Sequence, residues 1–248
     1  MTTLDTGRLV EGMREEIEAF ARTVAGGDPE AKVPTCPEWR LRDLVGHIGQ
    51  AERWAAELVR TTAPLPIPDP FEAERVAPES WARWLRDGAE ELIAAVVESP
   101  RDAQVWSVLG PAPARFWLRR ILCDTIVHRY DASATTGVPH ELAGDLAADV
   151  LREGLELLSA PGVETFKPEL AELRGSGQSI GVRPDGMEGW LIVRTPEGVR
   201  WELGRADGDV VVSGPVRELM LVFTRRVPPG RVSGDRALLE HWLANTAF

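Results

Sequence analysis

Residues 115–132 read RFWLRRILCDTIVHRYDA, and their apolar members recur at the spacing of an α-helix. Trp117, Ile121, Asp124 and His128 share one stripe of that helix, because residues three and four apart are neighbours on a helix surface. The stripe therefore sets an acid and a histidine one turn apart beside large apolar side chains. Such a pair is also common as a plain surface contact, so the spacing alone leaves both interpretations open.

The same periodicity extends in both directions from this stretch and predicts a bundle of helices. Beyond residue 160 the pattern changes to short β-rich segments separated by glycine turns, with a helix before and after the last short strand. The sequence therefore predicts an α+β protein with an all-helical bundle over residues 1–160 and a smaller α+β domain over 161–248. The helices expected in the bundle span about 7–25, 40–60, 80–98, 114–135 and 141–159.

Composition and charge exclude several classes of protein. The chain has 248 residues, 44% of them apolar and 27% charged, which is ordinary for a globular protein. Its net charge of −11 argues against a nucleic-acid partner, and no apolar run is long enough to span a membrane. The sequence shows no signal peptide and only two cysteines, Cys36 and Cys123, so it predicts a location in the reducing cytoplasm. Nothing in it indicates an oligomeric state.

Several polar residues fall on faces that should be buried. His47 lies between Leu44 and Ile48 on the second expected helix, much as Asp124 and His128 lie on the fourth. Burying such groups without partners is costly, and a metal ion would satisfy them all. Two imidazoles and one carboxylate form a three-ligand set for a divalent ion, with positions left for water or substrate.

Three further residues carry expectations of their own. Asp131, one turn beyond His128, is placed to orient a ligand histidine through a hydrogen bond. Cys36 is expected to be a small packing residue rather than a reactive thiol. His140, in the loop GVPHEL, is expected to be solvated.

Several motifs resemble one known family, the mycothiol-dependent maleylpyruvate isomerases. VPTCPEW and DLVGHI stand between residues 33 and 48, and IVHRYD follows at 126–131. VVVSGPVRELMLVFTRR at 210–226 and VSGDRALLEHW at 232–242 resemble the C-terminal domain of that family. The resemblance covers most of the chain and implies a DinB-like helical bundle followed by a small α+β domain.

The resemblance also implies a site. A divalent metal, expected to be zinc, would be held by His47, Asp124 and His128, with mycothiol as the thiol cosubstrate. Asp124 is a departure, since the family pattern usually has a glutamate there. In the tail, Arg226 of FTRRVPP stands where the family has a typical arginine, and it would hold a substrate carboxylate. Arg225 is the alternative, and an ordinary surface role for Arg226 stays open.

Together these features predict a metal-dependent thiol enzyme, a mycothiol-dependent isomerase or S-transferase acting on a small anionic electrophile. Two other functions remain open. One is a non-haem iron enzyme, because two histidines and one carboxylate also bind iron in oxygenases. The other is a non-catalytic module that binds a small molecule. The sequence does not indicate the substrate or the residues that contact the thiol.

Overall fold

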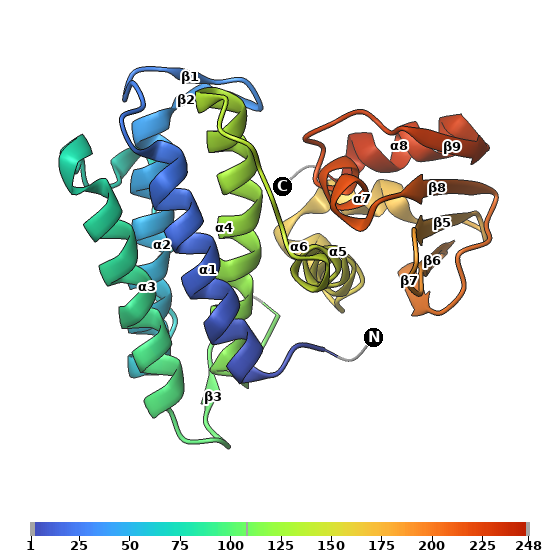
Figure 1. Cartoon of the computed structure of the whole chain (residues 1–248). Helices are drawn as coiled ribbons and strands as arrows, with labels where there is room; N and C mark the ends of the chain where they lie inside the picture. The colour runs from blue at the N-terminus through green and yellow to red at the C-terminus, as the bar shows by residue number, and fades with distance from the viewer. Residues whose placement is uncertain (1–2, 108, 247–248) are drawn as a thin grey trace. The chain divides into compact units, whose positions relative to one another are not determined.

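The computed structural model of the chain describes residues 3–107 and 109–246, without the side chain of Phe166. These residues form two compact units, one over Leu4–Glu141 and the other beginning at Leu142. The first unit is helical and the second combines helices with one sheet (Figure 1). The predicted α+β fold class is therefore confirmed. Within the described part of the chain, no helix is both long and apolar enough to cross a membrane.

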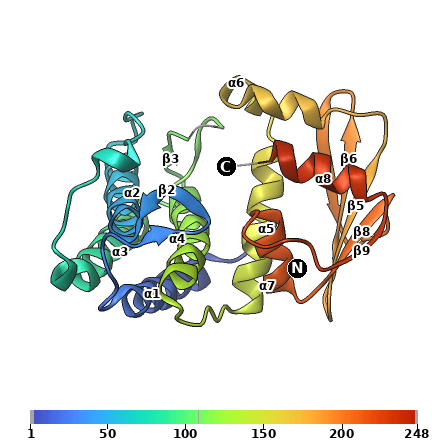
Figure 2. The same ribbon diagram turned by 90° about the horizontal axis from the view of Figure 1, so that it is seen from above.

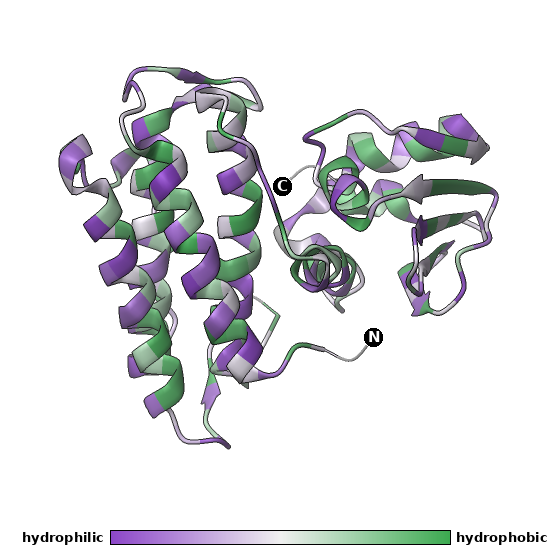
Figure 3. Ribbon diagram, viewed as in Figure 1, coloured by the Kyte–Doolittle hydropathy of each residue, from purple (hydrophilic) through white to green (hydrophobic). Residues whose placement is uncertain are grey.

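Four long helices build the first unit. Helix α1 packs on α3 and α4, and α2 packs on the same two helices, so each helix buries an apolar stripe against two neighbours. The alternation of hydrophobic and hydrophilic positions along the helices follows this packing (Figure 3). The helices are α1 (Thr6–Val24), α2 (Leu41–Thr61), α3 (Trp81–Glu98) and α4 (Arg115–Thr136).

Two short hairpins and a long connector complete this unit (Figure 2). Strands β1 (Lys32–Val33) and β2 (Cys36–Arg40) form an antiparallel pair that leads directly into α2. Strands β3 (Gln104–Val105) and β4 (Ala112–Pro113) pair before α4. The connector between α2 and α3 holds two single turns of 3-10 helix, η1 (Pro70–Glu72) and η2 (Pro78–Ser80).

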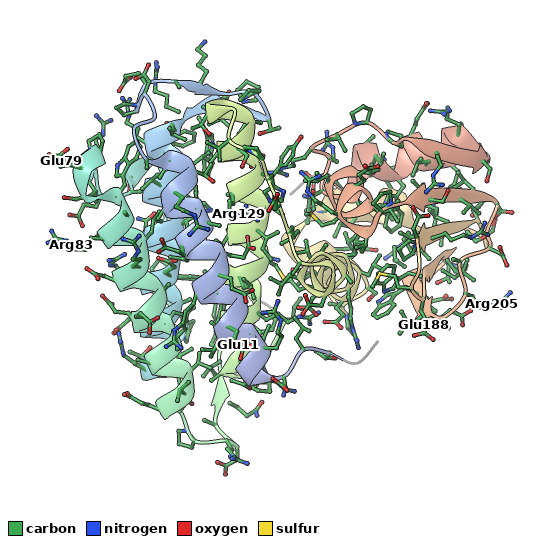
Figure 4. The ribbon with its side chains drawn as sticks, viewed as in Figure 1. Glu11, Glu79, Arg83, Arg129, Glu188 and Arg205 are labelled. Carbon is green, nitrogen blue, oxygen red and sulfur yellow. The ribbon has the colours of Figure 1, made fainter. Side chains whose placement is uncertain are left out.

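A buried ion pair fixes how α4 faces α1. Arg129 Nε donates to Glu16 Oε2 at 2.6 Å, and the two residues are only 3% and 4% exposed. A second guanidinium nitrogen of Arg129 donates to the Glu141 carbonyl, so the pair also binds the segment that follows α4. Figure 4 labels Arg129 among the helices of this unit. Because Arg129 directly follows His128, this contact also limits the rotation of α4 about its axis and so the direction of the His128 side chain.

The second unit has a five-stranded sheet in the order β7-β6-β5-β8-β9. Strands β5 and β8 are parallel, and all other neighbours are antiparallel. Helix α7 packs on α5, and both α7 and α8 contact strand β8. The strands are β5 (Ser179–Pro184), β6 (Trp190–Thr195), β7 (Gly198–Leu203), β8 (Val210–Gly214) and β9 (Arg231–Gly234). The helices are α5 (Gly144–Leu158), α6 (Val163–Phe166), η3 (Pro168–Leu173), α7 (Val216–Phe223) and α8 (Arg236–Asn245).

Every predicted long helix and strand is present, but the units divide earlier than residue 160. The division lies between Glu141 and Leu142, so α5 belongs to the second unit. Helix α5 packs on α7, and a Cβ added at Gly144 would lie 3.6 Å from the Val216 side chain. Periodicity reveals that a helix has an apolar face but does not reveal which partner covers it.

Candidate metal centre

The three predicted ligands meet where α2 packs on α4. His47 Nε2 lies 3.1 Å from Asp124 Oδ2, and His128 Nε2 lies 4.0 Å from Asp124 Oδ1. One donor atom from each residue lies within 4.8 Å of the other two, and the two imidazole rings meet edge to face at 5.1 Å. Asp124 and His128 therefore face His47 on another helix, whereas an ordinary pair on a helix surface would face solvent.

The spacing of these donor atoms fits one divalent ion. Ligand atoms about 2.0–2.2 Å from a tetrahedral zinc stand roughly 3.3–3.5 Å apart. The separation of His47 and Asp124 is already close to this value, whereas the other pairs of donor atoms, which lie within 4.8 Å of one another, would need to shorten by up to about 1.5 Å. The side chains of His47, Asp124 and His128 are 22%, 27% and 12% exposed, so the centre is open to small molecules. Three protein donors would leave at least one coordination position.

Asp131 sets the orientation of His128. Its Oδ2 atom lies 2.9 Å from His128 Nδ1, and its Oδ1 atom accepts from the Thr35 hydroxyl at 2.6 Å. Asp131 is fully buried, which excludes water as a competing partner. Because the Asp131 carboxylate accepts a hydrogen bond from Nδ1–H, the lone pair of neutral His128 is on Nε2, the nitrogen that faces Asp124. A carboxylate behind a histidine is the usual arrangement for a metal ligand.

Two basic groups flank the Asp124 carboxylate. Arg120, one turn earlier on α4, donates to Oδ1 at 3.2 Å, and His47 contacts Oδ2. Burial raises the pKa of Asp124, but the hydrogen bond with His47 and the positive charges of His128 and Arg120 together outweigh burial, so its pKa is well below the ordinary value. Asp124 is therefore ionised at neutral pH, as a metal ligand must be.

The β1–β2 hairpin supplies groups that the sequence prediction missed. Thr35 precedes β2 and donates to Asp131, and Trp39 on β2 covers the two histidines. The Trp39 ring stacks on His128 with 5.5 Å between ring centroids and meets His47 edge-on at 5.1 Å. These strands are too short for any periodic signal, so only the resemblance of VPTCPEW indicated that the segment mattered. The hairpin therefore forms an aromatic wall on one side of the centre.

Cys36 and His140 were the other two residues for which the sequence carried an expectation. The Cys36 thiol is half-buried and lies 3.8 Å from Asp131 Oδ2, and it can also be grouped with His128 and Asp131 as possible donors. The expectation that His140 is solvated is wrong, because it is 7% exposed and packs edge to face on Tyr130 at 5.4 Å. The segment after α4 runs back along this helix, because Arg129 donates to the Glu141 carbonyl and Tyr130 contacts His140.

Arg226 belongs to the second unit and follows helix α7. Its Nη1 atom donates to the Thr224 carbonyl at 2.8 Å, and its backbone N–H donates to the Leu221 carbonyl. Arg225 is exposed and has a φ of 64°, the left-handed conformation that ends a helix. The role of Arg226 toward a substrate carboxylate stays a prediction.

Comparisons with known proteins agree with this architecture. Residues 10–133 match the family model of the mycothiol maleylpyruvate isomerase N-terminal domain. The fold of the whole chain is similar to the crystal structure of a mycothiol-dependent maleylpyruvate isomerase, with a TM-score of 0.62 and 16% identity over 94% of this chain and 96% of the other. A variant of such an isomerase, in which alanine replaces one histidine, matches with a TM-score of 0.59, 15% identity and the same coverage. The search of curated proteins found no match.

The fold and site thus define a class of two-unit protein in which a helical bundle gathers two imidazoles and one carboxylate. Within that class, the chain belongs to the mycothiol maleylpyruvate isomerase family, since the family model covers half of its length, including all three candidate ligands. The resemblance stated from the motifs is therefore confirmed.

Proposed function

We propose that this protein is a divalent-metal-dependent thiol enzyme that uses mycothiol to isomerise a small anionic electrophile or to transfer sulfur to it. Zinc is the expected metal, with His47, Asp124 and His128 as its ligands. Membership of the family supports the use of mycothiol. Free thiols require a reducing compartment, so the proposal also places the protein in the cytoplasm.

One observation carries the proposal. The Nδ1 atom of His128 is held by the fully buried Asp131, which leaves Nε2 to face the ionised Asp124 and the ring of His47. Three donors that converge in this way, with one of the imidazoles held from behind by a buried carboxylate, are hard to explain by packing alone.

A divalent ion held at this centre would lower the pKa of a bound thiol and so supply a nucleophile at neutral pH. The thiolate adds to one carbon of an activated cis alkene, forming a C–S bond while the π electrons move toward the neighbouring carbonyl group. Rotation about the resulting single bond, followed by cleavage of the C–S bond, returns the thiol and the trans alkene. If the adduct is kept or another group leaves instead, the outcome is S-transfer.

The residues of the chain would restrict and orient this chemistry. Trp39 covers one side of both histidines, which keeps bulk water from that side of the centre. Arg120 brings a positive charge to within 3.2 Å of Asp124, which favours anionic reactants nearby. Arg226 would hold the carboxylate of the electrophile, with its planar guanidinium suited to two parallel hydrogen bonds.

A non-haem iron enzyme is the second candidate, because the same set of two imidazoles and one carboxylate binds iron in oxygenases. Protein purified without oxygen and analysed for bound metal would distinguish the two candidates. About one zinc per chain favours the thiol enzyme, whereas iron together with thiol-independent oxygen consumption would overturn it.

The activity test uses zinc-loaded full-length protein with mycothiol and maleylpyruvate, and with a panel of conjugated electrophiles, followed by ultraviolet absorbance. His47→Ala should remove bound zinc and thiol-dependent turnover together while the helical circular dichroism persists, because the bundle is held by apolar contacts. Arg226→Met and Arg225→Met should be compared with anionic and esterified electrophiles. A raised KM for the anionic form alone identifies the anchoring arginine. If unmodified, metal-loaded protein neither binds nor turns over mycothiol, the proposed function is wrong.

A further inference from the structure

A second feature of the helical unit has no role in the chemistry above. A pocket of about 130 Å³ lies between the first turns of α2 and the connector that leads to α3. Its lining includes Arg42, Asp43, Phe71, Glu74 and Trp81. This volume is well below the roughly 300–1,000 Å³ of sites that enclose drug-sized ligands. The pocket therefore suits a single ring of a larger molecule rather than a whole cosubstrate. We call it the connector pocket.

The connector is held in place, although it has little regular structure. Trp54 Nε1 on α2 donates to the Pro66 carbonyl at 2.9 Å, and Trp81 Nε1 donates to the Val76 carbonyl at 3.0 Å. The Asp69 side chain accepts from the Phe71 N–H at 2.8 Å and caps the turn that carries this ring. Four prolines between residues 64 and 70 also limit the backbone. The wall of the pocket is therefore preformed.

Aromatic contacts lead from the connector pocket to the metal centre. The Phe71 ring meets Trp39 edge to face with 5.9 Å between centroids, and Trp39 contacts both His47 and His128. Phe71 is nevertheless 55% exposed, which is high for a side chain of this size in a capped turn. A ligand whose sulfur lies at the metal centre could therefore extend past Trp39 and reach the exposed part of Phe71.

Some polar atoms around the pocket lack partners among the described residues. Arg42 pairs with Glu30 through another guanidinium nitrogen, but its Nε is buried without a hydrogen bond, because Asp43 Oδ1 lies 3.7 Å away and Asp43 Oδ2 accepts from the Arg40 N–H. The side chains of Glu74 and Arg75 make no hydrogen bond or ion pair within the described residues. The lining thus offers both donors and acceptors beside aromatic rings. Its positive side chains are Arg42 and Arg75, and its negative ones are Asp43 and Glu74.

This balance of charge decides what kind of ligand fits. A carboxylate or phosphate would be attracted by the arginines but repelled by Asp43 and Glu74 at the same rim. A neutral ring with several hydroxyl groups avoids this conflict, because each hydroxyl both donates and accepts. Its C–H face can also lie against Phe71. Mycothiol joins its cysteine to an amino sugar and a cyclitol, both rings rich in hydroxyl groups.

We propose that the connector pocket binds one hydroxyl-rich ring of mycothiol, with Phe71 as its platform and Arg42 and Glu74 as its polar contacts. This inference rests on the proposed function, and it assigns selectivity for the thiol to the segment between α2 and α3. The pocket would add affinity for mycothiol without contacting the sulfur, the metal ligands or the electrophile.

The test compares mycothiol with N-acetylcysteine, which lacks both rings, using the zinc-loaded full chain. Unmodified protein should prefer mycothiol in kcat/KM. Phe71→Ala and Glu74→Gln should each raise KM for mycothiol roughly five- to tenfold, the loss of one ring contact or hydrogen bond, with kcat and zinc content unchanged. Neither variant should change the kinetics with N-acetylcysteine by more than about twofold. Ile67→Ala is the matched control, because Ile67 is 70% exposed on the same connector and does not line the pocket.

Three outcomes would overturn the inference alone, and a fourth would overturn it together with the proposed function. Equal losses with both thiols would mean that Phe71 acts through Trp39 on the metal centre. Unchanged KM for mycothiol in both variants would mean that the pocket binds no part of it. An enzyme that uses the two thiols equally well would retain its metal-dependent thiol chemistry but have no ring subsite. Absence of mycothiol binding to the unmodified protein by calorimetry would instead overturn the proposed function and the subsite together.

Discussion

Replacing Asp131 with asparagine should weaken zinc binding roughly 10–100-fold while the fold persists. Asparagine has nearly the same shape but no charge, and its amide group can present N–H to His128 Nδ1 instead of accepting from it. The neutral histidine would then hold its proton on Nε2, the atom that must bind the ion. A hydrogen bond between His128 and a charged partner is worth about 1.5–3 kcal/mol, which corresponds to this range of affinity.

Thr35→Val provides the graded comparison. It removes the 2.6 Å hydrogen bond to the same carboxylate but leaves the contact between Asp131 and His128. This bond to a charged group is itself worth about 1.5–3 kcal/mol, but it does not contact His128, so only part of it should reach the metal centre and zinc affinity should fall about tenfold or less. Both affinities can be measured by competition with a chromogenic chelator, and thermal unfolding of the metal-free proteins reports the fold. If Asp131→Asn binds zinc within about twofold of the unmodified protein, Asp131 does not orient a metal ligand.

Three further predictions concern stability. Burial raises the pKa of the Glu52 carboxyl well above its ordinary 4.5. The contribution of Glu52 to the stability of the fold is therefore fully present below that ordinary value and is lost as the pH rises through the raised pKa. Glu52→Gln should raise the Tm at pH 8, and the difference in Tm from the unmodified chain should shrink toward pH 5. Arg225→Gly should stabilise the chain in urea by about 0.5–1 kcal/mol, because glycine adopts the φ of 64° without strain. Arg129→Met should cost about 3–5 kcal/mol by leaving Glu16 buried without its partner, and adding Glu16→Gln should recover much of this.

Each stability prediction has a contradicting result. Parallel Tm curves for Glu52→Gln and the unmodified chain across pH would mean that Glu52 ionises in the folded protein as it does in the unfolded one. A loss of stability in Arg225→Gly would mean that the arginine side chain makes contacts worth more than the backbone strain. Equal costs for Arg129→Met and the double variant would mean that the guanidinium acts through packing rather than charge.

The fold could be predicted from the sequence because the helices are long and their apolar residues are strongly periodic. The stripe through Asp124 and His128 is a property of one helix, so the same reasoning predicted that these side chains share a direction. It could also have paired Arg120 with Asp124, which are four residues apart as well. The membership of α5 could not be predicted, because the partner that covers an apolar face is decided by tertiary packing.

The remaining parts of the site depend on contacts distant in sequence. Asp124 is 77 residues from His47, and Asp131 is 96 residues from Thr35. No spacing rule connects such pairs, so His47 entered the ligand set through an apolar-face argument and through the resemblance. Thr35 and Trp39 stand on a hairpin whose strands are too short to show a pattern. The connector pocket was missed because its proline-rich segment reads as a simple linker.

The aspartate at position 124, where the resemblance implies a glutamate, bears on the alternative of a non-catalytic binding module. The geometry argues otherwise, because Asp124 Oδ2 lies 3.1 Å from His47 Nε2 without the additional methylene. Helices α2 and α4 pack closely enough for the shorter side chain to reach, and Arg120 holds its other oxygen. Burying the Asp131 carboxylate behind His128 costs free energy, and a binding module that lacks metal would gain nothing from it. The three candidate ligands together with their hydrogen-bonded support form the arrangement expected of a centre that holds an ion.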